Sequence, residues 1–151
     1  MDKIELNDNK IVPGAFTVWS EPGAADCVMD LKALSFRQNS IKEIYSFHVL
    51  DHLYPEDTDV ALKNWFHCLG KGGKVFILVD DFEYIARGYV GGDVSIETFN
   101  QIHSHPTQFT QDNLTKALLK AGFKDIVVWY GGIPGIYENK KHYELILAGV
   151  K

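Results

Sequence analysis

Residues 43–81 constrain the fold most strongly, because they contain an apolar strand, a helix and a second apolar strand in that order. Residues 41–47 and 75–79 are the apolar runs, and the segment 55–69 between them repeats apolar side chains at i, i+3, i+4 and i+7. Two strands joined by a helix at this spacing predict a right-handed βαβ unit in a parallel sheet. Gly70, directly after the helix, is the expected left-handed C-cap.

Further elements are predicted on both sides of this unit. Additional short strands are expected at residues 3–6, 16–19, 27–29, 126–129 and 143–148, and additional helices at residues 81–87 and 110–121. Only nine residues separate the first two strands, too few for a crossover helix. Residues 88–109 have weak periodicity and are expected to form a lid or an irregular insertion.

These elements predict one α/β domain spanning residues 1–151. We expect a three-layer Rossmann-like arrangement with a mixed, mostly parallel seven-stranded sheet. The last strand is expected to be antiparallel, because the connection before it is short enough for a direct return. The N-terminal part is expected to be shortened, because it lacks room for the first helix.

Charge and hydropathy exclude several classes of partner. The formal net charge is -5 and no run of basic residues occurs, so nucleic acid is not an expected partner. The apolar runs have the length of strands, so no membrane span is expected. Cys27 and Cys68 lack metal-ligand spacing and the N-terminal segment does not resemble a signal peptide, so a reducing, cytoplasmic location is expected.

Several motifs occur in a characteristic order along most of the chain. They are Val-Pro-Gly-Ala-Phe at residues 12–16, Met-Asp-Leu at 29–31, Ile-Tyr-Ser-Phe-His-Val-Leu-Asp-His at 44–52, Leu-Gly-Lys-Gly-Gly at 69–73 and Phe-Thr at 109–110 before the last helix. This order resembles the class I S-adenosylmethionine-dependent methyltransferases, in particular a short, minimal branch. The resemblance implies that S-adenosylmethionine binds at the carboxyl ends of the strands.

The resemblance also assigns residues to the cofactor. The turn after the first strand, an acid after the second, an acid after the third and the end of the fourth strand line the cofactor site in such enzymes. The corresponding residues here are Asn7, Asp8, Asn9, Ser20, Glu21, Asp30, Leu31, Phe47 and His48. The turn contains no glycine in this chain, unlike the glycine-rich turn of the family.

Methyl transfer requires alignment of the nucleophile and removal of a proton. His52, in the His-x-x-Asp-His sequence of residues 48–52, is one candidate base, and Asp81 after the fifth strand is another. The acceptor is expected to be a small molecule. No metal ligand is assigned under this hypothesis.

Two other functions remain open. A methyltransferase-fold protein without catalysis, acting as a binding or dimerising partner, is consistent with the turn that lacks glycine; a homodimer would cover apolar surface left by the shortened N-terminal part. A metal-dependent hydrolase using His48 and His52, together with His103 and His105, is the third hypothesis. The histidines could also serve only to cap and pack.

Overall fold

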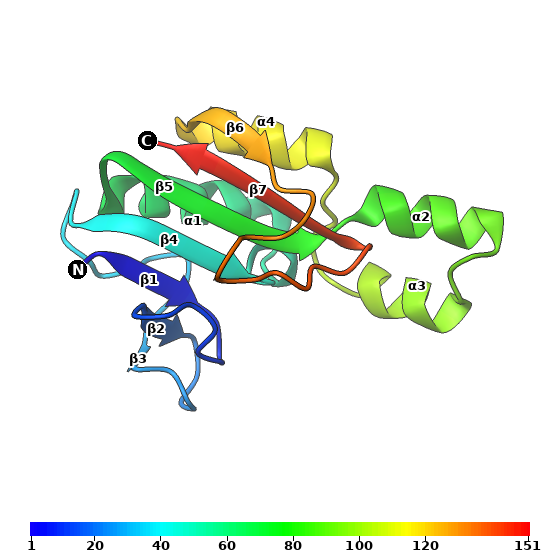
Figure 1. Cartoon of the computed structure of the whole chain (residues 1–151), viewed down its shortest axis with the longest axis horizontal. Helices are drawn as coiled ribbons and strands as arrows, with labels where there is room; N and C mark the ends of the chain where they lie inside the picture. The colour runs from blue at the N-terminus through cyan, green and yellow to red at the C-terminus, as the bar shows by residue number, and fades with distance from the viewer.

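The protein forms one seven-stranded sheet, which a computed structural model describes over residues 1–151 (Figure 1). The strand order is β3-β2-β1-β4-β5-β7-β6. β7 pairs antiparallel with β5 and β6, and the other pairs are parallel. The strands are β1 Lys3–Leu6, β2 Phe16–Trp19, β3 Cys27–Val28, β4 Ile41–Phe47, β5 Leu69–Asp80, β6 Lys124–Val128 and β7 Glu144–Val150.

All of the helices come after β4 in the chain. They are the short 3-10 helix η1 Leu50–His52 and the α-helices α1 Pro55–Cys68, α2 Phe82–Gly91, α3 Ile96–His103 and α4 Gln111–Ala121. In Figure 1, α2 and α3 form a pair that projects beyond the end of β5. None of the helices is both long and apolar enough to span a membrane.

The two faces of the sheet are covered differently. α1 and α4 cover one face, where Trp65 and Leu118 belong to the main hydrophobic core together with strand residues such as Ile77. On the other face, Phe47, Phe76 and Ile146 pack against Val12 and Ile133, which lie in connecting loops. No helix connects β1, β2, β3 and β4. The expected mixed, mostly parallel seven-stranded sheet of a Rossmann-like fold is confirmed, but the layer on this second face consists of loops and not of helices.

The expected C-cap at Gly70 is wrong. β5 begins at Leu69, immediately after α1, so Gly70 lies in the strand, and the positive φ of 75° falls at Gly72. A Cβ atom on Gly70 would lie 3.3 Å from the carbonyl oxygen of Asn39. Glycine is therefore present here because two backbone segments approach closely, and not because a helix ends in a left-handed residue.

Residues 88–109 are more regular than expected. α2 continues to Gly91 and ends at the left-handed Gly92 (φ 86°), and α3 begins after Ser95, whose side chain accepts a hydrogen bond from the Thr98 backbone N–H. The periodicity was weak because each helix buries a single residue, Ile85 in α2 and Ile102 in α3. Whether this pair acts as a lid remains a prediction.

Trp65 of α1 links the helical layer to the loop after β3. Its side chain is fully buried, and its indole N–H donates a hydrogen bond of 2.8 Å to the carbonyl oxygen of Leu31. We expect Trp65→Phe to lower the free energy of unfolding by about 2–3 kcal/mol, because it leaves a cavity and an unpaired buried carbonyl. Urea denaturation measures this loss. Val60→Ala, at an exposed position of the same helix, is the control and should change stability by less than about 0.5 kcal/mol; an equal effect of the two substitutions would contradict the assignment.

Candidate functional site

A cavity of about 720 Å³ opens where β1, β2 and β4 end. The carboxyl ends of parallel strands are the usual ligand-binding edge of an open α/β sheet. Most of the residues that the sequence assigned to the site line this cavity: Asn7, Asp8, Asn9, Ser20, Asp30, Leu31, Phe47, His48 and His52. The sequence analysis did not assign Ile11, Trp19, Lys32, Val49, Leu53, Leu78 and Tyr137, which also line it.

Two predicted site residues lie outside this cavity. Glu21 is exposed in the loop after β2 and does not line the cavity. Asp81 is the N-cap of α2, and its carboxylate accepts hydrogen bonds from the backbone N–H groups of Glu83 and Tyr84. The neighbouring Asp80, the last residue of β5, is the buried carboxylate at this strand end.

Glu5 fixes the turn that replaces the glycine-rich one. This fully buried carboxylate accepts hydrogen bonds from the backbone N–H groups of Ile11 and Val12 and from the side-chain amide of Asn7. No residue from Asn7 to Asn9 has a positive φ, so the turn does not require glycine. Asp8 and Asn9 are exposed and hydrogen-bond each other through their side chains. Glu5 therefore holds the turn after β1 in place.

His48 is the centre of the polar side of the site. It has a left-handed backbone (φ 52°), a conformation in which histidine is enriched among non-glycine residues. Its Nδ1 lies 3.3 Å from Oδ2 of Asp51, and its Nε2 lies 3.1 Å from Oε2 of Glu144, the first residue of β7. Burial by itself lowers the pKa of His48, but the hydrogen bonds to Asp51 and Glu144 outweigh it and raise this pKa to about 10. His48 is therefore a cation at neutral pH.

The pKa values of the carboxylates around His48 shift in different directions. Burial raises the pKa of Asp80, although the nearby His48 opposes this. The pKa of Glu144 is lowered, because hydrogen bonds from His48, the Lys141 backbone N–H and the Tyr137 hydroxyl outweigh its burial. Burial and Glu144 together raise the pKa of Tyr137 to about 12. Tyr137 therefore stays a neutral donor to an ionised Glu144.

A second cavity of about 280 Å³ lies on the other side of His48. Its lining includes Asp80 and Glu144 from the sheet, His105 after α3 and Gln101 of α3. His48 is the residue that lines both cavities. A ligand in one cavity and a ligand in the other would both lie beside this imidazole.

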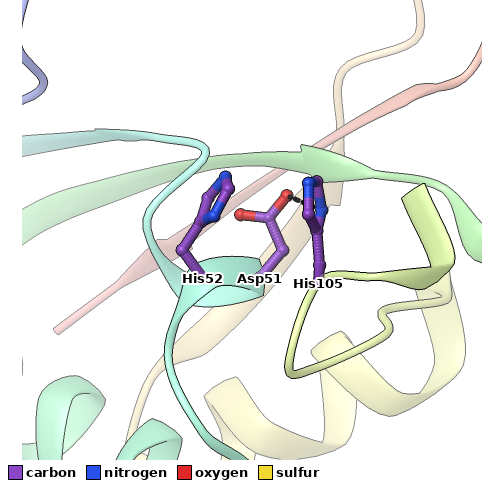
Figure 2. Close-up of side chains that lie close together, drawn as sticks. All are labelled: Asp51, His52 and His105. Carbon is purple, nitrogen blue, oxygen red and sulfur yellow. Dashed lines mark ion pairs between the residues drawn. The ribbon is translucent and has the colours of Figure 1, made fainter. Parts of the chain in front are cut away.

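The histidines do not form the pair that the metal hypothesis used. Both ring nitrogens of His48 face carboxylates, and the side chains that could hold a metal ion form two groups, one with His48, Asp51 and Asp80 and one with Asp51, His52 and His105. His103 is exposed and stacks on Phe82 and Phe99, away from the cluster. His105 instead approaches Asp51, with its Nδ1 3.5 Å from Oδ2 (Figure 2).

The comparisons with known proteins agree on the fold. Residues 12–77 match a protein-family model described as a methyltransferase domain. An S-adenosylmethionine-dependent methyltransferase from Thermotoga maritima superposes with a TM-score of 0.58 at 18% identity, over 91% of this chain and 65% of that protein. An S-adenosylmethionine-dependent methyltransferase from Methanosarcina mazei superposes with a TM-score of 0.65 at 12% identity, over 99% of this chain and 92% of that protein. Human N-acetylserotonin methyltransferase, solved in complex with S-adenosylmethionine, superposes with a TM-score of 0.65 at 14% identity, over 99% of this chain and 47% of that protein.

The comparisons relate the chain to one type of fold. The chain shares the fold of S-adenosylmethionine-dependent methyltransferases of known structure, and its residues 12–77 are similar to the methyltransferase-domain family, in line with the resemblance of the sequence motifs. No curated protein sequence matches the chain significantly. The chain spans 65% of the Thermotoga protein and 47% of the human one, so it is shorter than either of these neighbours.

The buried position of Glu5 leads to a stability prediction. In Glu5→Gln, an NH2 group replaces one carboxylate oxygen. This group cannot accept the hydrogen bonds that the backbone N–H groups donate to that oxygen. We expect the free energy of unfolding to fall by about 1–3 kcal/mol. Chemical denaturation measures this change, with Glu21→Gln, an exposed acid, as the unaffected control. Equal stability of the two variants would contradict the role of Glu5.

The ion pairs of His48 lead to a pH dependence. Because the folded-state pKa of about 10 lies above the ordinary 6.5, their stabilisation is complete below about pH 6.5 and is lost as pH rises toward 10. His48→Asn keeps a residue that tolerates the left-handed backbone. In metal-free buffer, the stability difference between wild type and this variant should therefore shrink between pH 6.5 and pH 10. A constant difference over this range, measured by urea denaturation, would refute a raised pKa.

Proposed function

We propose that this protein is an S-adenosylmethionine-dependent methyltransferase that acts on a small-molecule acceptor. The observation that carries the proposal is the cavity of about 720 Å³ at the carboxyl ends of β1, β2 and β4, lined by residues from each segment that such enzymes use. The methyltransferase match over residues 12–77 supports the same function.

The residues around the cavity are compatible with the cofactor. Asp30 is exposed beside the cavity, and its carboxylate is held by the Lys32 backbone N–H at 2.9 Å, which leaves its second oxygen free of hydrogen bonds within the chain. Asp30 and Leu31 would hold the adenine end, Ser20 would hold the ribose, and the turn Asn7 to Asn9 would face the amino-acid end. Bound S-adenosylmethionine supplies an electrophilic methyl group, so the chain has to align an acceptor and remove a proton.

The acceptor is proposed to occupy the smaller cavity, because His48 borders both cavities. Asp80 lines this smaller cavity and Asp81 does not, so Asp80 is the carboxylate placed to receive a proton from an acceptor. His48 is protonated and held between two carboxylates, so its role is to position groups on either side of it.

A second candidate is a binding protein of the same fold that does not catalyse. The side chains of Asp8 and Asn9 support it, because they line the cavity at positions where glycine would let a cofactor approach the backbone. In that case the cavity would still bind a ligand, without transfer of a methyl group.

Calorimetric titration of S-adenosylmethionine and S-adenosylhomocysteine tests the first proposal. We expect saturable binding of one molecule per chain. Asp30→Asn removes a charged acceptor but keeps the oxygen that holds the Lys32 N–H, so affinity should fall by about tenfold with the fold intact.

Glu21→Gln is the matched control, because Glu21 is a nearby acid that does not line the cavity. Its affinity should equal that of wild type. The absence of heat and of a thermal shift with both ligands at millimolar concentration would contradict the methyltransferase proposal. Binding without methyl transfer to any of a panel of small amine, hydroxyl and thiol acceptors would favour the second candidate.

A further inference from the structure

We propose that Asp51, His52 and His105 form a binding site for one divalent transition-metal ion. One ligand atom from each of the three residues lies within 4.8 Å of the others. Figure 2 shows the carboxylate of Asp51 between the two imidazoles. The imidazole rings of His52 and His105 have centroids 4.3 Å apart.

The backbone holds these residues together from two distant segments. Asp51 and His52 belong to η1, which follows the left-handed His48, and His105 lies two residues after α3. The Thr107 N–H donates to the Asp51 carbonyl at 3.2 Å, and the Thr107 hydroxyl donates to the Leu53 carbonyl at 2.6 Å. The loop that carries His105 is therefore fixed against η1 independently of any ligand.

Unpartnered polar atoms point to a missing ligand. Asp51 is 2% exposed, and its Oδ1 has no hydrogen-bond partner. Nδ1 of His105 is also buried and makes no hydrogen bond. Buried polar atoms without partners are rare, because each one loses its hydration without compensation. A cation bound by both residues would satisfy both atoms.

The surrounding charges favour a cation. Three carboxylates, Asp51, Asp80 and Glu144, are each less than one tenth exposed and lie around His48. The imidazole of His48 lies between them, while Lys141, at the smaller cavity, is exposed. Asp80 also faces His105, with Oδ2 3.5 Å from Nδ1. Buried carboxylates in excess of their cations are costly unless a cation joins them.

The donor types indicate the kind of metal. Two imidazoles and one carboxylate suit zinc and other first-row transition metals better than magnesium or calcium, which prefer oxygen ligands. A tetrahedral site with bonds of about 2.1 Å needs donors roughly 3.4 Å apart. The Asp51 carboxylate lies at about this distance from His105, since its Oδ2 is 3.5 Å from Nδ1, and its unpartnered Oδ1 is the oxygen left free for the ion. His52 is exposed, so a small rotation of its side chain can complete the set.

The three ligands would leave at least one coordination position open. His52 lines the larger cavity and His105 lines the smaller one, so the ion would lie where the two cavities approach each other. Such a metal could bind a water molecule or an oxygen or nitrogen atom of a small ligand. This inference does not depend on methyl transfer.

The test uses the full chain, stripped with a chelator and then titrated with Zn²⁺ alone. Calorimetry should show one ion per chain, and the unfolding temperature should rise by about 5–10 °C when the metal is at a hundred times its Kd. Co²⁺ should give visible absorption bands. His52→Ala, at an exposed position, and Asp51→Asn should each weaken binding by at least about tenfold.

His103→Ala is the matched control, because His103 is an exposed histidine close in sequence that lies outside the cluster. It should bind Zn²⁺ as wild type does. Absence of binding to the stripped wild type, or unchanged affinity in His52→Ala, would overturn the proposal and leave the two rings as a packing contact. If Asp51→Asn fails to fold, the Zn²⁺ affinity of His52→Ala tests the proposal alone. Titration of S-adenosylmethionine into the same stripped protein separates failure of this site from failure of the proposed function.

Discussion

The hydrogen bonds of His48 to Asp51 and Glu144 connect the parts of the chain on which the site depends. His48 leaves β4 in a left-handed conformation, which directs the next residues into η1. β7 runs antiparallel to β5, so its first residue, Glu144, pairs with Asp80 at the carboxyl end of β5. A single imidazole therefore joins β4, η1 and β7 and separates the two cavities. Its positive charge offsets part of the negative charge that these elements bury.

Glu5 has a corresponding role at the turn after β1. In many nucleotide-binding turns, glycine allows the backbone to come close to the ligand. Here the fully buried Glu5 carboxylate holds the loop through the N–H groups of Ile11 and Val12, and the turn has no left-handed residue. The absence of glycine therefore does not distort the turn. What changes is the surface that faces the cavity, which carries side chains of Asp8 and Asn9.

The parts of the fold and of the site that depend on local sequence patterns were predicted correctly. Strand and helix periodicity located the βαβ unit, and motif order located Asp30, His48 and His52, which line the cavity. Gly70 was misassigned, because a glycine after a helix has the same local pattern whether it ends the helix or permits a close backbone contact. Glu144 could not be found from the sequence, since it contacts His48 from 96 residues away. His105 was named from the sequence as a metal candidate with the other histidines, but its contact with Asp51 exists only in the folded chain.

The central claim is that the cavity at the ends of β1, β2 and β4 binds the cofactor. Mapping by two-dimensional ¹H–¹⁵N NMR during addition of S-adenosylhomocysteine tests this claim most directly, because it reports the location of binding residue by residue. We predict that the largest shifts fall on the turn after β1, on Asp30 and Leu31, and on residues 47–53. Shifts confined to α2 and α3, or no shifts at saturating ligand, would contradict the claim.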